Sequence, residues 1–297
     1  NNANTGDYYT NFMMVMPAEH QLAGMEIQAD MLFNSILPED KFEKEKGIVL
    51  EEIAQSLSKP ATQMDYNLTA ELYRGHALSL PTLGTYATIE HMQRDDVNHY
   101  YKSTYRPNNM ILSAIGNFDS KEMLKEIDRI YGAAAPGSVF RPADENLKTG
   151  MNIPDVGMDA GAWLDRYYDG EVSTLHLLYP LKKDTPKGFD KLMDLALKEN
   201  AQKLETALKT EWANDVDGLA VQLHVTPIAR HIEYKVNLKQ EDHAVAIGES
   251  LQKLVKKSKF RIPAATLASL ATKEKTAFLQ NVEKPHMFGI YNAFDLA

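Results

Sequence analysis

The stretch "FEKEKGIVLEEIAQS", residues 42–56, decides the fold of the first half of the chain. Its apolar residues recur at helical spacing, which predicts a helix. Glu45 and Glu52 are seven residues apart, and a helix that turns about 100° per residue aligns them on one face. Because Ile48 and Val49 lie between them, we expect that face to be the apolar one, directed into the protein.

Two carboxylates on a core-facing stripe need an explanation, because an isolated buried charge is very costly. One interpretation is that each forms a salt bridge with a Lys or Arg of a neighbouring element, which is a common arrangement. The other is that Glu52 ligates a metal while Glu45 orients one of the remaining ligands. The spacing alone leaves both interpretations open.

Composition places the chain among soluble globular proteins. It has 297 residues, enough for about two domains, with 44% apolar and 25% charged residues. The net charge of −9, from 32 Lys and Arg against 41 Asp and Glu, argues against nucleic acid as a partner. No apolar run is long enough to predict a membrane span. The chain has no cysteine, so a metal would have to be held by His and carboxylate side chains.

The compartment is not decided by the sequence. Absence of cysteine fits a bacterial envelope protein, so we favour the periplasm over the cytoplasm. The chain opens with Asn1 rather than Met. We therefore expect a processed product or a piece of a longer protein.

Predicted strands and helices alternate along the chain. A proline-rich and glycine-rich stretch without a sustained period predicts a linker over residues 136–160, between a domain at 1–135 and an incomplete one at 161–297. The fold class is α+β: two related domains, each an antiparallel or mixed sheet packed against helices. The predicted strands cover residues 10–16, 108–116, 172–181, 218–227 and 230–238, and the predicted helices cover 17–36, 39–57, 60–75, 93–104, 120–132, 189–212, 241–258 and 263–279.

The nine histidines do not form a metal-binding motif. No two are three or four residues apart, so H-E-x-x-H and H-x-x-E-H are both absent. His224 and His231 flank a predicted hairpin turn and are placed to face each other. They alternate with Gln222, Glu233 and Lys235, which favours a solvated sheet face over a metal site. By itself, the chain cannot complete a zinc site.

The helix "EKGIVLEEI" resembles the third-ligand helix of the insulinase/pitrilysin family, the M16 inverted-zincin metallopeptidases. In that family, H-x-x-E-H supplies two zinc ligands and the general base. A downstream helix with the pattern E-[RK]-x-V-[VIL]-x-x-E supplies the third ligand. The resemblance implies that Glu52 is that ligand and that Glu45 supports a ligating histidine.

The resemblance extends to nearly the whole chain, with specific motifs in the first 120 residues and only an architectural match after residue 160. It implies a fold of the LuxS/MPP-like metallohydrolase type. The opening strand is similar to the family's N-A-x-T-x-x-x-x-T-x-[YF] segment through Asn2, Ala3, Thr5, Thr10 and Phe12. A later stretch is similar to the family through Gly84, Thr85, Ile89, Tyr105, Pro107, Asn109, Met110 and Gly116.

One departure from the family is large, because its histidine motif would fall upstream of Asn1. We expect the chain to be a piece of a longer peptidase; the alternative is a parent that lacks the motif and acts as a non-catalytic partner, scaffold or peptide-binding subunit. Zinc is thus expected in the parent and absent or weakly bound in this chain.

The family's architecture implies peptide hydrolysis in a chamber of two halves, fused or dimeric. It also implies that peptides bind in extended form at the sheet edge formed by Asn2, Ala3, Asn4 and Thr5.

Overall fold

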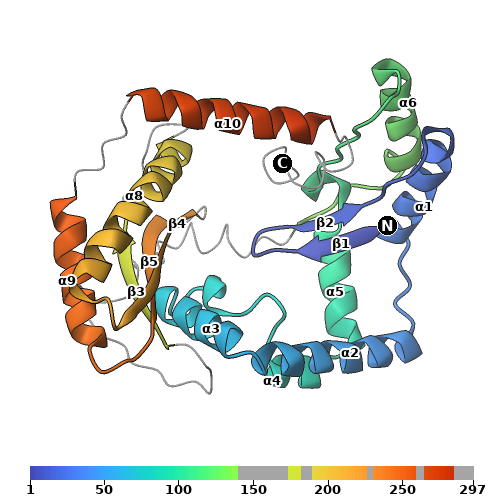
Figure 1. Cartoon of the computed structure of the whole chain (residues 1–297). Coiled ribbons are helices and arrows are strands. Elements are labelled where there is room, and N and C mark those ends of the chain that lie inside the picture. Colours follow the sequence, from blue (N-terminus) through green and yellow to red (C-terminus); the bar gives the residue numbers. More distant parts are fainter. Residues whose placement is uncertain (140–172, 182–188, 226–229, 259–263, 284–297) are drawn as a thin grey trace. The chain divides into compact units, whose positions relative to one another are not determined.

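The computed structural model describes residues 1–139, 173–181, 189–225, 230–258 and 264–283 (Figure 1). The chain forms two compact units. The first comprises residues 1–59, 80–151 and 276–297, and the second comprises residues 60–79 and 152–275. The predicted linker at 136–160 lies mostly outside the described residues, and the predicted domain limits remain predictions.

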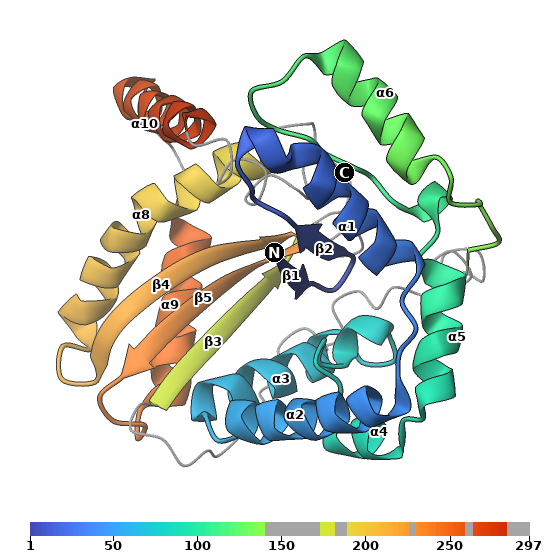
Figure 2. The same cartoon turned by 90° about the vertical axis from the view of Figure 1, so that its right-hand side faces the viewer.

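The first unit contains a short hairpin. β1 (Asn2–Thr5) pairs antiparallel with β2 (Thr10–Met13), and the register places Thr5 opposite Thr10. The hydroxyls of these two threonines lie 3.3 Å apart. Within the described residues the hairpin is a two-stranded sheet (Figure 2).

Helices make up most of the first unit, and two of them begin at caps that the sequence encodes. α6 begins after Asp119, whose Oδ1 accepts hydrogen bonds from the N–H groups of Lys121 and Glu122 at 2.9 and 3.0 Å, which is the usual arrangement of an N-cap. α4 begins after Thr85, which forms a reciprocal capping box with Thr88. The helices that lie wholly within the described residues of this unit are η1 (Ala18–His20), α1 (Gln21–Phe33), α2 (Glu39–Leu57), α4 (Tyr86–His91), α5 (Arg94–Thr104), η3 (Pro107–Asn109) and α6 (Ser120–Tyr131).

The strand predicted at residues 108–116 is wrong. The chain turns through η3 and then runs on without regular structure, and the backbone N–H groups of residues 111–115 form no hydrogen bond with the described residues. Ile111 and Ile115 are 62% and 40% exposed. The apolar pattern of a strand is present, but a strand exists only where a second strand accepts its hydrogen bonds.

The second unit contains an antiparallel sheet with the order β3-β5-β4, formed by β3 (Ser173–Pro180), β5 (Arg230–Leu238) and β4 (Val216–Val225). α8 (Phe189–Glu211) and α9 (Ala244–Lys257) cover one face of it. The most deeply buried side chains of this core are Leu197, Leu208, Val216, Tyr234, Val236, Ile247 and Leu251.

The remaining described helices are α3 (Pro60–Leu72), η2 (Ala77–Ser79) and α10 (Ala264–Val282). The predicted order of strand, helix, strand, strand, helix, helix is confirmed for the second half, and so is the α+β class. The turn between β4 and β5 lies outside the described residues. Period-two alternation on β5 directs Tyr234 and Val236 to the helices and leaves a polar opposite face.

Candidate functional site

Helix α2 places Glu45 and Glu52 on its exposed surface, so the expectation that they point into the protein is wrong. Their seven-residue spacing does align them, within about 20° of each other around the helix axis. The buried stripe, however, runs roughly 90° away from that line. Ile48 is 39% exposed. The residues that face the unit are Phe42, Lys46, Val49, Leu50, Ile53 and Ser56.

The cause is that α2 has apolar side chains on two sides. α2 packs against α4, and the Lys46 Nζ donates a hydrogen bond to the Met92 carbonyl oxygen at 3.1 Å, which turns the Lys46 side of the helix inward. In the described part of the chain, neither Glu45 nor Glu52 has an ion-pair partner, so the alternative salt bridge does not form there either. Both carboxylates lie on one exposed face of α2, without an ion pair to the described residues.

The four residues predicted to bind peptide, Asn2 to Thr5, form β1, and all four are exposed. One edge of β1 pairs with β2. The other edge has no strand beside it among the described residues. An unpaired edge presents a row of N–H and C=O groups that an extended chain can bind.

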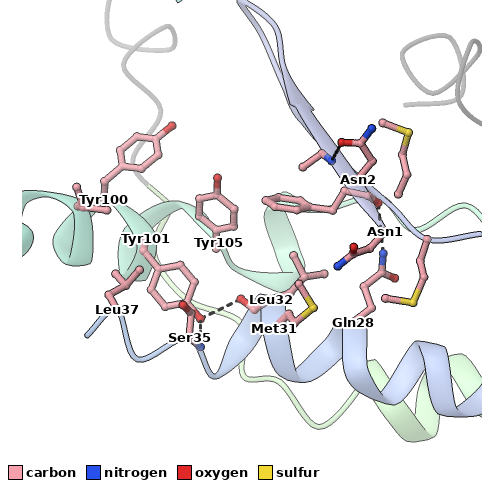
Figure 3. A pocket seen from close by; sticks show the side chains of 15 residues that line it. Asn1, Asn2, Gln28, Met31, Leu32, Ser35, Leu37, Tyr100, Tyr101 and Tyr105 are labelled. Carbon is pink, nitrogen blue, oxygen red and sulfur yellow. Dashed lines mark hydrogen bonds between the residues drawn. The ribbon is translucent and has the colours of Figure 1, made fainter. Parts of the chain in front are cut away.

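A cavity of about 440 Å³ lies in the first unit beside the start of β1. Its walls come from β1, β2, α1, α5 and the α1–α2 connection (Figure 3). The ring of Tyr105 contacts those of Phe12 and Tyr101, with centroid distances of 5.8 and 5.5 Å respectively. Burial raises the pKa of Tyr105. The lining is therefore aromatic and largely apolar. It consists of residues 1–3, 12–14, Gln28, Met31, Leu32, Ser35, Leu37, Val97, Tyr100, Tyr101 and Tyr105.

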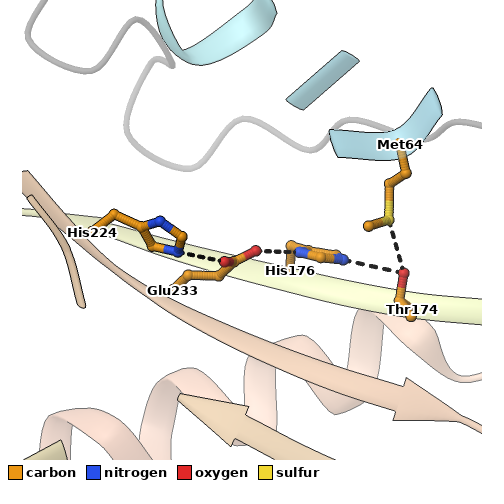
Figure 4. A network of polar contacts seen from close by, with 5 residues as sticks. All are labelled: Met64, Thr174, His176, His224 and Glu233. Atoms are coloured by element: carbon orange, nitrogen blue, oxygen red, sulfur yellow. Dashed lines mark hydrogen bonds and ion pairs between the residues drawn. The ribbon is translucent and has the colours of Figure 1, made fainter. Parts of the chain in front are cut away.

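The second unit holds a network of polar side chains on the sheet face opposite α8 and α9 (Figure 4). Glu233 accepts hydrogen bonds from His176 Nδ1 at 2.5 Å and from His224 Nε2 at 2.7 Å. The Thr174 hydroxyl lies 3.1 Å from His176 Nε2 and donates to the sulfur of Met64 in α3. The network therefore joins all three strands to α3.

His224 and His231 face each other across the β4–β5 pair, as predicted, with parallel rings 4.6 Å apart. The prediction that this sheet face is solvated is wrong around His231 and Glu233, because His231 is only 5% exposed and the Glu233 side chain is only 13% exposed. Sequence reasoning missed His176 as a member of this network. Only the β3–β5 register, which places His176 opposite Lys235, brings it next to Glu233.

The electrostatics of this network follow from burial and hydrogen bonding. Burial alone would raise the pKa of Glu233, but the hydrogen bonds from His176 and His224 outweigh it and hold that pKa well below its usual range. Burial and the neighbouring His224 lower the pKa of His231 to about 4. Glu233 is thus an ionised carboxylate held between two imidazoles.

None of the described side chains converge as a metal site: no group of three or more His, Asp or Glu residues among them could hold an ion. Glu233 uses both carboxylate oxygens for its two histidines. Glu52 is available as a single oxygen ligand, and a zinc site requires at least three protein ligands.

Comparison with known proteins decides the family. The family model "Insulinase (Peptidase family M16)" matches residues 1–86, and the model "Peptidase M16 inactive domain" matches residues 91–153. The chain belongs to the M16 peptidase family. This membership rests on the matches and the fold, because Glu45 and Glu52 are exposed and not directed into the protein as predicted.

The relatives of this M16 chain carry protease names. It is 30% identical over 132 residues to the "Uncharacterized zinc protease YmxG" of Bacillus subtilis, covering 44% of this chain and 32% of the relative. A protease from Helicobacter pylori has a similar fold, with a TM-score of 0.71 and 16% identity over 95% of this chain and 68% of that one. The first half of the periplasmic protease PqqL from Escherichia coli also has a similar fold, with a TM-score of 0.63 and 14% identity over 96% of this chain and 62% of that one.

The matched region spans about a third of the length of the curated relatives. No helix among the described residues has both the length and the apolar character to cross a membrane.

Proposed function

We propose that this M16 chain is part of a zinc-dependent metalloendopeptidase, in which α2 supplies Glu52 as the third zinc ligand. Two histidines and a general base would come from an H-x-x-E-H segment outside these 297 residues. The observation that supports the proposal is the match of residues 1–86, which include Glu45 and Glu52, to the M16 insulinase model. The two carboxylates share one exposed face of α2, so Glu52 is accessible to a metal held partly by other polypeptide.

The proposal gives residues of this chain separate roles in metal binding and in peptide binding. Glu52 would bind the metal through a carboxylate oxygen, and Glu45, two helical turns before it, would accept a hydrogen bond from a ligating histidine. When bound, zinc acts as a Lewis acid that polarises the scissile carbonyl. The free edge of β1, Asn2 to Thr5, would hold a peptide in extended form through its backbone groups. Backbone recognition of this kind tolerates many peptide sequences.

A second half, fused or present as a partner subunit, would complete the chamber around the peptide. Similarity to a structure named as the first half of a periplasmic protease supports this arrangement. The same similarity favours a periplasmic location for this chain.

A second function has a specific observation in its favour. The model that matches residues 91–153 describes an inactive domain. A non-catalytic family member would keep the β1 edge for peptide binding and would act as a partner or scaffold.

The test is substitution of Glu52 in the full-length protein. Glu52→Gln should reduce the zinc bound per molecule at least tenfold and abolish cleavage of a fluorogenic peptide, and Glu45→Gln should weaken zinc binding roughly 10-fold to 100-fold. Glu51→Gln, next in sequence on another exposed part of α2, is the matched control. Unchanged zinc content in Glu52→Gln would remove Glu52 from the ligands, and a full-length protein without zinc would favour the partner role.

A further inference from the structure

The connection between α1 and α2 contains an unusual backbone conformation. Leu37 has a φ of 44°, the only positive φ of a non-glycine residue among those the structure describes. For a residue with a Cβ, this left-handed conformation is unfavourable, because the Cβ comes too close to the following carbonyl oxygen. It persists only where surrounding contacts hold it in place. Pro38 follows and is the N-cap of α2, so Leu37 sets the direction in which α2 begins.

Arg94, the first residue of α5, holds this connection. Its guanidinium donates hydrogen bonds to the carbonyl oxygens of Leu37 and, at 3.0 Å, of Ile36. It also lies 3.7 Å from the carboxylate of Glu39, the first residue of α2. Charge-assisted hydrogen bonds of this kind are roughly twice as strong as neutral ones.

Tyr101 holds the other end of the same connection. It is seven residues after Arg94, and the two side chains therefore leave α5 on the same face. Its hydroxyl donates to the Leu32 carbonyl oxygen at 2.9 Å and accepts from the Ser35 N–H at 3.1 Å (Figure 3). Two side chains of one helix thus fix both ends of a short segment.

The third fixed point is farther along α2. The bond from Lys46 to the Met92 carbonyl attaches α2 to the residue that ends α4, two positions before Arg94. α2 is therefore fixed at its start and near its middle to one segment, residues 92–101. A slip of one residue at the connection would rotate both carboxylates about 100° around the helix axis.

We propose that Arg94 and Tyr101 are positioning residues for the metal-ligand helix α2, and that they set the direction in which Glu45 and Glu52 point. The inference rests on the proposed function for its link to zinc. Neither side chain touches the ligand positions. Both act through the backbone of residues 32–37, in particular through the left-handed conformation of Leu37.

Amide hydrogen exchange of this 297-residue chain tests the mechanical part. Arg94→Ala should speed exchange of the amides in residues 35–45 roughly 10-fold to 100-fold, because local opening loses its charge-assisted hydrogen bonds. Tyr101→Phe removes one oxygen atom and should give a smaller increase in the same residues. Arg129→Ala, which breaks the exposed ion pairs of Arg129 with Glu26 of α1 and Glu126 of α6, should leave exchange at residues 35–45 unchanged. Tyr86→Phe, at an exposed tyrosine on α4, should also leave it unchanged.

Zinc affinity, measured by competition with a chelator in the full-length protein, tests the link to the ligand. Arg94→Ala should weaken zinc binding roughly tenfold or more, and Arg94→Lys should restore part of it. A role in stability alone would lower the melting temperature without this rescue.

Two results would overturn the proposal: unchanged exchange at residues 35–45 in both Arg94→Ala and Tyr101→Phe, or faster exchange with unchanged zinc affinity. If Arg94→Ala fails to fold, Tyr101→Phe carries both measurements. Failure of the proposed function would appear separately, as zinc binding that does not respond to Glu52→Gln.

Discussion

Glu233→Gln is the substitution that tests the polar network of the second unit most directly. Gln has the same shape as Glu but offers one acceptor oxygen and one donor nitrogen, so it can accept from only one of His176 and His224. The other histidine must change tautomer or lose its partner. The change therefore removes one charge-assisted hydrogen bond and weakens the second.

The magnitude follows from burial and bond type. A hydrogen bond to a charged group contributes roughly 1.5–3 kcal/mol. The Glu233 and His176 side chains are largely buried, whereas the His224 side chain is a third exposed. The hydrogen bond between His224 and Glu233 therefore contributes at the low end of that range. We expect Glu233→Gln to lower the free energy of unfolding by about 2–3 kcal/mol at pH 7.

Urea unfolding followed by tryptophan fluorescence measures this loss. Both tryptophans of the chain, Trp163 and Trp212, lie after residue 152, so the signal reports on the second unit. Glu249→Gln, the same chemical change at an exposed position of α9, is the matched control and should shift stability by less than about 0.5 kcal/mol. Equal midpoints for the two variants would refute the reasoning.

The pH dependence gives a second check. Because hydrogen bonding holds the folded-state pKa of Glu233 below its unfolded value of 4.5, its stabilisation is complete above pH 4.5 and is lost as the pH falls through the folded-state pKa. The deficit of Glu233→Gln should therefore persist from pH 7 to pH 5 and shrink only in stronger acid.

Three further predictions concern other parts of the chain. The pKa of His231 is lowered from 6.5 to about 4, so its contribution to the free energy of unfolding should fall by about 3 kcal/mol as the pH drops from 6.5 to 4. Denaturation curves across that pH range should show a smaller loss of stability for His231→Phe than for the unsubstituted chain. Leu208→Ala should cost about 2–5 kcal/mol in urea unfolding, and Leu192→Ala, exposed on the same helix, should cost almost nothing. Ile111→Lys should reduce concentration-dependent association in sedimentation velocity, because Ile111 is an exposed apolar residue in the segment 111–115, which has no strand beside it among the described residues. Leu124→Lys, at an exposed position on α6, should not reduce it. An equal effect of both substitutions would show that the segment 111–115 does not drive the association.

Sequence reasoning predicted the long helices well because their signals are local. α2 was expected at residues 39–57 and occupies Glu39–Leu57. The start of α6 at Ser120 was also found, since a helix start depends on a few adjacent residues. The order of elements in the second half was found for the same reason.

Features that depend on distant parts of the chain were not predictable. α2 has Ile48 on one side and Val49 with Ile53 on another, and only contact with α4 decides which side is buried. The pattern of residues 108–116 is that of a strand, but a strand needs a partner that the pattern does not specify. His176 joined the network through the β3–β5 register, which no local signal encodes.

The cavity beside β1 is lined by three methionines, Met13, Met14 and Met31, and Met31 is exposed. Methionine is the only sulfur-containing residue in this cysteine-free chain. Oxidants that reach the sulfur atoms would convert apolar thioethers into polar sulfoxides on the wall of an aromatic cavity. Peroxide would thus change the chemistry of this surface, and methionine sulfoxide reductases would restore it.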